Sequence, residues 1–144
     1  MSDLILLEGD QAMFLPTFGA AIVIVRPGDL QGSGPSTLQG KKVCVDGDEK
    51  HVAVPGCPYM TPQYSIPGTG TLKITALASN QRAQKTRTGG KVVLLKGGQF
   101  TAAFEVQTPA QQPPPGPGAP IPDATPRYSG QGMFVTTNTH FWGS

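Results

Sequence analysis

The residues with the clearest chemistry in this sequence are two cysteines and two histidines, Cys44, His51, Cys57 and His140. Thiolate sulfur and imidazole nitrogen are the ligands that structural zinc sites prefer, and a closed tetrahedral site uses four of them. Six residues separate Cys44 from His51 and five separate His51 from Cys57, which matches neither a C-x-x-C knuckle nor a zinc finger. A site built between hairpins does not need such spacing. The hypothesis is therefore a zinc site that uses some of these four residues, with zinc as the only cofactor considered.

The same residues also have a structural interpretation. Cys44 lies in the apolar run at residues 43–45, where a free cysteine packs as a small hydrophobic side chain. Cys57 lies in a proline-bounded turn at residues 55–58, and His51 is expected to be exposed. Two cysteines indicate no disulfide framework, so both are expected to be reduced thiols.

Three carboxylates lie beside these residues, at Asp46, Asp48 and Glu49 of the stretch VCVDGDEKH. A general acid needs an apolar environment that raises its pKa, and nothing nearby promises one. Gly47 between the two aspartates indicates a tight turn, where carboxylates accept hydrogen bonds from local backbone N–H groups. The stretch also lacks the length and ligand pattern of an EF-hand loop, and the chain has no G-x-S-x-G nucleophile elbow. We predict that this protein is not an enzyme.

The elements that must position these residues are short β-strands. Apolar or alternating runs bounded by Gly and Pro occur at residues 4–7, 20–25, 43–45, 71–77, 91–95, 100–106 and 134–137. We expect the runs at 91–95 and 100–106 to form a hairpin around Gly97 and Gly98. Convincing helical periodicity is missing throughout. The pattern predicts an all-β fold of short strands and hairpins, in a compact cone-like or β-roll domain with an extended Pro-rich segment near the C-terminus.

One pattern occurs three times. LILLEGD (residues 4–10), VCVDGD (43–48) and VVLLKGG (92–98) each place an apolar run before one charged residue and then Gly-Asp or Gly-Gly. A strand followed by a pair that tolerates positive φ is typical of a tight turn. We interpret the three segments as one strand-and-turn device used three times.

The composition suggests one domain with a Pro-rich appendage. The chain has 144 residues, 19 glycines and 15 prolines, the length of a single domain. Prolines concentrate between Pro109 and Pro126, where they favour an extended, polyproline II-like conformation. We predict a β domain over residues 1–108, a Pro/Gly-rich strap or linker over 109–127, and an aromatic strand segment over 128–144 that packs back on the domain or on a partner.

Charge and hydropathy limit the partners and the location. The net charge is +2, and the basic run from Arg82 to Lys96 contains no aromatic residue to stack on bases, so we expect no nucleic acid. The start, MSDLILLEGD, has no basic region before its short apolar run, so we expect no signal peptide. No stretch approaches the roughly 20 apolar residues of a membrane span. We expect a protein made in the cytoplasm, without a membrane anchor.

These features together resemble a known family. The segment GDQAMFLPTFGAAIVIVRPG (residues 9–28), the segment GKKVCVDGDE (40–49) and the absence of an export signal are similar to the PAAR-like spike-tip proteins of type VI secretion and other contractile injection systems. The similarity covers about residues 1–108. The chain lacks the Pro-Ala-Ala-Arg tetrapeptide, and it has only His51 and His140 where the zinc sites of that family use three histidines and one cysteine.

The resemblance implies a structural function. Such a protein is a tip or adaptor that caps the trimeric, VgrG-like spike, has an effector or chaperone as a further partner, and is exported by the injection apparatus without a signal peptide. Three strand-and-turn devices in one chain could approximate the threefold symmetry of a trimer. The alternative is a zinc-stabilised small β binding module unrelated to secretion.

Overall fold

The computed structural model describes residues 3–38, 40–114, 116–136, 138 and 141–144. Its main element is an antiparallel sheet of eight strands that curls into a half-barrel. In their order across the sheet, the strands are β3 (Thr17–Phe18), β4 (Ala21–Val23), β8 (Ala53–Met60), β9 (Gly68–Ala76), β12 (Gln99–Thr108), β15 (Arg127–Val135), β2 (Gln11–Phe14) and β5 (Gly28–Asp29). The all-β prediction is confirmed.

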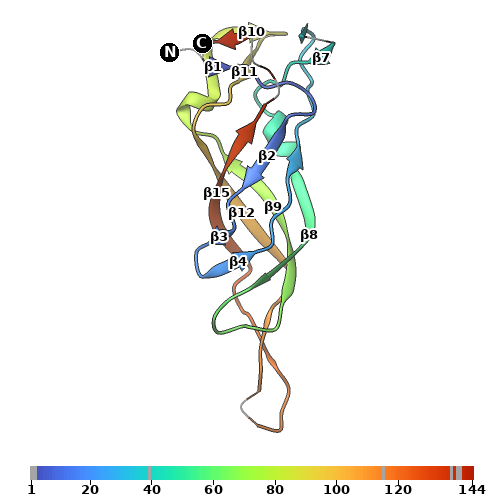
Figure 1. Cartoon of the computed structure of the whole chain (residues 1–144), viewed down its shortest axis with the longest axis vertical. Coiled ribbons are helices and arrows are strands. Elements are labelled where there is room, and N and C mark those ends of the chain that lie inside the picture. The colour runs from blue at the N-terminus through green and yellow to red at the C-terminus, as the bar shows by residue number, and fades with distance from the viewer. Residues whose placement is uncertain (1–2, 39, 115, 137, 139–140) are drawn as a thin grey trace.

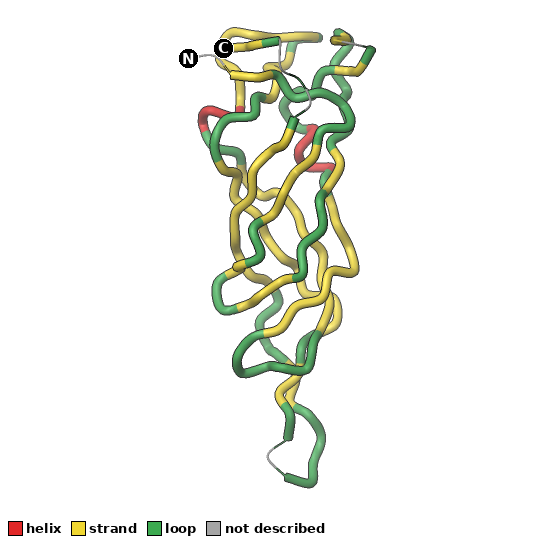
Figure 2. Tube along the Cα trace, in the orientation of Figure 1, coloured by secondary structure: helices red, strands yellow, loops and turns green. Residues whose placement is uncertain are grey.

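Smaller elements complete the described part of the chain (Figure 2). The two-stranded ribbons are β1 (Asp3–Leu4) with β16 (Trp142–Gly143), β6 (Thr37–Leu38) with β7 (Lys41–Lys42), β10 (Arg82–Thr88) with β11 (Lys91–Leu94), and β13 (Gln111–Gln112) with β14 (Ile121–Pro122). The helices are the short 3-10 turns η1 (Asp48–His51) and η2 (Ser79–Gln81). Within the described residues, no helix has both the length and the apolar character needed to cross a membrane.

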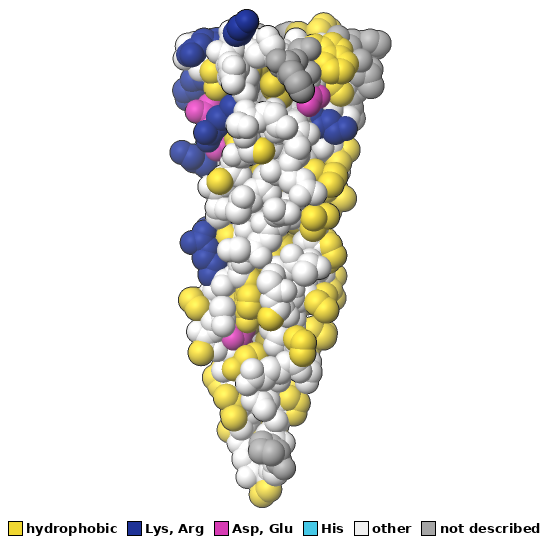
Figure 3. All heavy atoms as spheres, turned by 90° about the vertical axis from the view of Figure 1, so that its left-hand side faces the viewer, with side chains coloured by type: hydrophobic (Ala, Val, Ile, Leu, Met, Phe, Trp, Pro, Cys, Tyr) yellow, Lys and Arg dark blue, Asp and Glu magenta, His cyan; other side chains and the backbone are white. Residues whose placement is uncertain are grey.

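The molecule is a cone (Figures 1 and 3). Ribbons β1–β16, β6–β7 and β10–β11 lie together at its wide end, where both chain ends also lie, and the half-barrel forms the shaft (Figure 1). Ribbon β13–β14 and the loop between its strands form the narrow end. The predicted cone-like shape is therefore present, with the Pro-rich segment at its point.

Aromatic side chains fill the shaft, and glycines on neighbouring strands make room for them. Phe100 and Phe104 of β12 are fully buried; they are four residues apart and point to the same face, because side chains of a strand alternate. A Cβ at Gly132 would lie 2.5 Å from the Phe100 ring, and a Cβ at Gly70 would lie 2.5 Å from the Phe104 ring. A narrow barrel accommodates these rings only where the facing position has no side chain.

The strand pairing differs from one prediction. The runs at 91–95 and 100–106 form strands but not a common hairpin: β11 pairs with β10, and β12 pairs with β9 and β15. The chain instead changes direction at Gly97, which has φ of 51°. The aromatic segment that follows the Pro-rich region enters the sheet as β15, between β12 and β2.

Candidate functional site at the wide end

The three similar segments of the sequence meet at the wide end in a closed cycle of hydrogen bonds. The Cys44 N–H donates to the Leu6 carbonyl at 3.0 Å, the Leu6 N–H donates to the Leu94 carbonyl at 2.9 Å, and the Leu94 N–H donates to the Cys44 carbonyl at 2.9 Å. All three residues are fully buried. We call the strands that form this cycle, residues 5–8, 43–46 and 93–96, the ring.

The contacts on either side of this cycle repeat in the same cyclic order. Isolated bridges join the pairs Leu7–Val43, Val45–Val93 and Ile5–Leu95. The side chains of five of these residues, all except Val45, form a second hydrophobic core with Ala83. Every pair of neighbouring ring segments is therefore joined by the same kinds of contact. This is the pattern that an approximate threefold axis produces. The cyclic pattern supports the threefold arrangement that the repeats predict.

An antiparallel ribbon precedes each ring strand. Two are local ribbons with positive-φ glycines in their turns, Gly40 in β6–β7 and Gly89 with Gly90 in β10–β11. The third, β1–β16, pairs the two ends of the chain. The Ser144 carbonyl accepts the N–H groups of Lys85 and Thr86 at 2.7 and 2.8 Å, so this ribbon also attaches to β10.

Buried aspartates close two of the three ring turns. The Leu7 N–H donates to Asp10 Oδ2 at 2.7 Å, and the Val45 N–H donates to Asp48 Oδ2 at 2.8 Å. Both carboxylates lie three residues after their donor, which is a common local turn pattern. The second aspartate of VCVDGDEKH is thus a turn-forming residue, as the sequence predicts.

The third turn uses a different acceptor. It has Gly98 at the position of the two aspartates, and the Leu95 N–H donates instead to the Gln81 carbonyl at 2.9 Å. The Gln81 side chain is fully buried and donates through Nε2 to the Gly98 carbonyl at 3.0 Å. A residue of η2 thereby replaces the missing carboxylate.

The other two acids of VCVDGDEKH also make structural contacts. Asp46 forms an ion pair with Arg82, with 3.0 Å between Oδ1 and Nε. Glu49 is buried, and its Oε1 accepts the N–H of Gly47 at 2.8 Å, in a turn where Gly47 has φ of 102°. These contacts give each acid of the cluster a structural role.

Replacing Asp48 with alanine is expected to lower the free energy of unfolding by about 2 kcal/mol, because a buried backbone donor loses a charged acceptor. Asp48 also accepts the N–H of Ser33 at 3.1 Å and its hydroxyl at 2.6 Å. Urea unfolding measures the change, and Asp48→Asn, which keeps an acceptor oxygen, is expected to lose less. Equal stability of Asp48→Ala and the wild type would contradict this assignment.

The structure describes three of the four predicted zinc ligands. Cys44 and Cys57 both belong to the main hydrophobic core, and Cys57 lies within strand β8 instead of a turn, with its thiol donating to the Val54 carbonyl at 3.6 Å. His51 is exposed at the end of η1. His140 lies outside the described residues.

The surroundings of Cys44 favour its thiol over the thiolate that zinc would bind. Burial raises the pKa of the Cys44 thiol well above its usual range, and the nearby Asp48, Asp10 and Glu8 raise it further, whereas zinc binds the thiolate. Within residues 3–38, 40–114, 116–136, 138 and 141–144, no three His, Cys, Asp or Glu side chains gather closely enough to hold a metal ion. Because His140 lies outside these residues, the zinc site stays a prediction.

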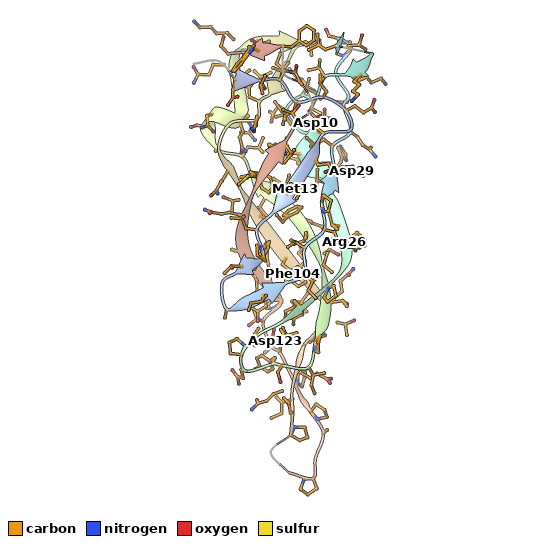
Figure 4. All side chains as sticks on the ribbon, in the orientation of Figure 1. Asp10, Met13, Arg26, Asp29, Phe104 and Asp123 are labelled. Atoms are coloured by element: carbon orange, nitrogen blue, oxygen red, sulfur yellow. The ribbon has the colours of Figure 1, made fainter. Side chains whose placement is uncertain are left out.

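A second polar cluster, which the sequence interpretation missed, lies where the shaft meets the narrow end (Figure 4). Asp123 Oδ2 accepts the hydroxyls of Tyr59 at 2.9 Å and Tyr128 at 2.6 Å, while Oδ1 accepts the N–H of Thr125 at 2.9 Å. The Tyr59 hydroxyl in turn accepts the N–H of Ala110 at 2.8 Å. We call these five residues the aspartate clamp. It joins both strands of ribbon β13–β14 to the sheet, because Ala110 precedes β13 and Asp123 follows β14.

The clamp holds its groups in defined charge states. Burial acts to raise the pKa of Asp123, but the hydrogen bonds from Tyr128, Thr125 and Tyr59 outweigh it and bring the pKa below its usual range. Burial raises the pKa of Tyr59 to about 12, and Asp123 contributes to this increase. Asp123 is the only charged residue between positions 106 and 126. A single carboxylate in an otherwise uncharged, Pro-rich segment is the sequence feature that could have pointed to the clamp.

Comparison with known proteins agrees with this architecture. No curated protein matches the chain. The family model described as "Contractile injection system spike tip protein" matches residues 1–144, which extends the similarity beyond residue 108. The predicted resemblance is confirmed. The chain therefore belongs to the contractile injection system spike tip family.

Proposed function

We propose that this protein caps a trimeric, VgrG-like spike through its wide end, with the narrow end pointing away. The observation that carries the proposal is the cyclic hydrogen bonding of Leu6, Cys44 and Leu94. A single chain with three similar ring segments can offer each subunit of a trimer an equivalent contact. One tip per spike trimer is then the natural stoichiometry, because one chain already supplies all three segments.

The rest of the proposal follows from this orientation. The protein acts as a rigid structural part and not as an enzyme, since its buried carboxylates bind backbone and hydroxyl groups in turns and in the clamp. It is made in the cytoplasm and leaves with the injection apparatus. An effector or chaperone that travels with it would have to bind the shaft, because the spike covers the wide end.

The proposal can be tested with one insertion at each end of the cone. A six-residue Gly/Ser segment between Gly89 and Gly90 enlarges a ribbon turn at the wide end, and the same segment between Gly116 and Pro117 enlarges the loop at the narrow end. Surface turns tolerate such insertions, so both variants should melt close to the wild type.

Capture by the purified trimeric spike protein of the same injection system measures the result. The insertion after Gly89 is expected to weaken capture at least about tenfold by blocking a close fit, and the insertion after Gly116 should leave it unchanged. The mass of the wild-type complex should correspond to one tip per trimer. Loss of capture only with the narrow-end insertion would reverse the proposed orientation.

A further inference from the structure

Positive charge is concentrated at the wide end. Most of the Lys and Arg side chains visible in Figure 3 lie there. Of the eleven Lys and Arg residues in the chain, those in or next to the ring and its ribbons are all exposed: Lys41, Lys42, Lys50, Arg82, Lys85, Arg87, Lys91 and Lys96. The others, Arg26, Lys73 and Arg127, lie along the shaft. The end that we assign to the spike is thus also the end that carries the cations.

The carboxylates of the wide end are engaged within the protein. Those that close or support the ring turns are buried: Asp10, Asp48 and Glu49. Asp46 is paired with Arg82, and Asp3 accepts two backbone N–H groups at 2.7 and 3.0 Å. Glu8 is exposed, as is Asp29 of β5, whose neighbour Leu30 bonds to the ring turn at Gly9 and Asp10. The groups that this end offers to a partner are therefore mainly cationic.

The cations are distributed unequally over the three ribbons. Ribbon β10–β11 carries Arg82, Lys85, Arg87 and Lys91 and no acid, whereas ribbon β1–β16 carries Asp3 and no Lys or Arg. Lys85 and Arg87 are two residues apart in β10, and both are exposed. Beside them, a surface hollow of about 440 Å³ is lined by Arg82, Lys85 and Ser144, among others. The backbone of the wide end is approximately threefold, but its charge is not.

We propose that ribbon β10–β11 recognises an acidic site on the end of the spike that receives the tip. This inference rests on the proposed function and specifies the chemistry of the partner. Cations at the rim of an interface attract an acidic partner over a distance and orient its approach. A threefold spike presents three copies of the acidic site. The tip can therefore bind in three equivalent orientations, and in each of them the ribbon contacts one copy.

A protein partner fits this ribbon better than nucleic acid does. No aromatic side chain lies between Arg82 and Lys96 to stack on bases. Arg82 already pairs with a carboxylate of its own chain, Asp46, at 3.0 Å, which is the kind of contact proposed for the neighbouring cations.

A matched pair of charge reversals tests the inference. Arg87→Glu in β10 and Arg127→Glu in β15 each replace an exposed strand arginine and change the net charge equally. The association rate with the purified trimeric spike protein is measured on a biosensor at about 0.05 M and about 0.5 M salt. The distance over which charges interact is several-fold shorter at the higher salt concentration. Thermal melting checks that both variants fold.

The expected result is a loss specific to the ribbon. Arg87→Glu should lower the association rate about tenfold at low salt and about twofold or less at high salt, and Arg127→Glu should stay within about twofold of the wild type throughout. Equal losses in both variants, or a wild-type rate independent of salt, would overturn this inference and leave the proposed function intact. Failure of the wild type to bind the spike would overturn both. A DNA duplex that binds as tightly as the spike, with the same dependence on Arg87, would also overturn it.

Discussion

Replacing Asp123 with alanine is expected to lower the free energy of unfolding by about 3 kcal/mol and to loosen the narrow end, because the clamp loses its acceptor. Asp123 is buried and accepts the hydroxyls of Tyr59 and Tyr128 and the N–H of Thr125. Tyr59 is itself 1% exposed, so its hydroxyl finds no water in place of the carboxylate. Urea unfolding measures the stability, and hydrogen exchange at Ala110 and Thr125 reports on the narrow end.

Two milder variants separate the contributions within the clamp. Asp123→Asn keeps an oxygen acceptor and loses the charge, so we expect about half of the alanine effect, since hydrogen bonds to charged groups are about twice as strong as neutral ones. Tyr128→Phe removes one hydroxyl that is only partly buried, and should cost about 1 kcal/mol. A loss for Tyr128→Phe as large as for Asp123→Ala would show that packing, and not the carboxylate, stabilises this region.

The clamp also predicts how stability depends on pH. The pKa of Asp123 in the folded protein lies below its ordinary value of 3.8, so the unfolded chain binds the proton more readily. The contribution of ionised Asp123 to the free energy of unfolding is complete above that ordinary value. It is lost as the pH falls through the pKa of the folded protein. The stability difference between wild type and Asp123→Asn should therefore shrink below about pH 4. For Tyr59, whose pKa is raised from 10.0 to about 12, the contribution is complete below pH 10 and is lost as the pH rises toward 12.

Replacing Phe104 with alanine is expected to cost about 3 to 5 kcal/mol, the largest effect of any single change that we consider. Phe104 is fully buried in β12, between the paired strands β9 and β15. Its ring centroid lies 5.1 Å from that of Tyr59 and 6.2 Å from that of Phe18. Figure 4 places Phe104 within the shaft. Its loss leaves a cavity beside Gly70, which lies against the Phe104 ring and has no side chain to fill the space.

An exposed hydrophobic residue on the same sheet provides the control. Ile22 of β4 is 58% exposed, and Ile22→Ala should cost less than about 1 kcal/mol, since little apolar surface is returned to water. Urea unfolding of both variants gives the comparison. Similar losses for the two would mean that the shaft is not packed around Phe104. Tyr59 of the aspartate clamp contacts both Phe104 and Asp123, so the Phe104 and Asp123 variants share a neighbour and their effects are not expected to add.

Much of the architecture follows from local patterns. The alternation of Leu72 and Ile74 with polar neighbours identifies a strand, which the structure places in β9. The Gly-Asp pairs predict turns correctly because their hydrogen bonds span only three residues, as from Val45 to Asp48. The residues at 9–28 and 40–49 also sufficed to identify the spike-tip family.

The pairing of strands could not be predicted in the same way. Gly97 and Gly98 suggested a hairpin, yet their neighbours β11 and β12 pair with other strands. A glycine pair permits a reversal of the chain but does not choose the partner, which depends on the burial of distant side chains. The metal hypothesis also rests on residue types and stays a prediction: Cys44 and His51 suit zinc by type, and the structure places Cys44 in the core and His51 at the surface.

Short strands joined by tight turns, the likeness of three segments and the family of the chain can all be recognised from its amino-acid sequence. The folded structure was needed to see that these segments close into one ring, that the Pro-rich segment forms the point of the cone, and that Asp123 joins it to the sheet. The physical reason is distance along the chain. A turn is stabilised by neighbours three residues away, whereas the bond from Tyr59 to Asp123 spans 64 residues and exists only once the sheet has assembled.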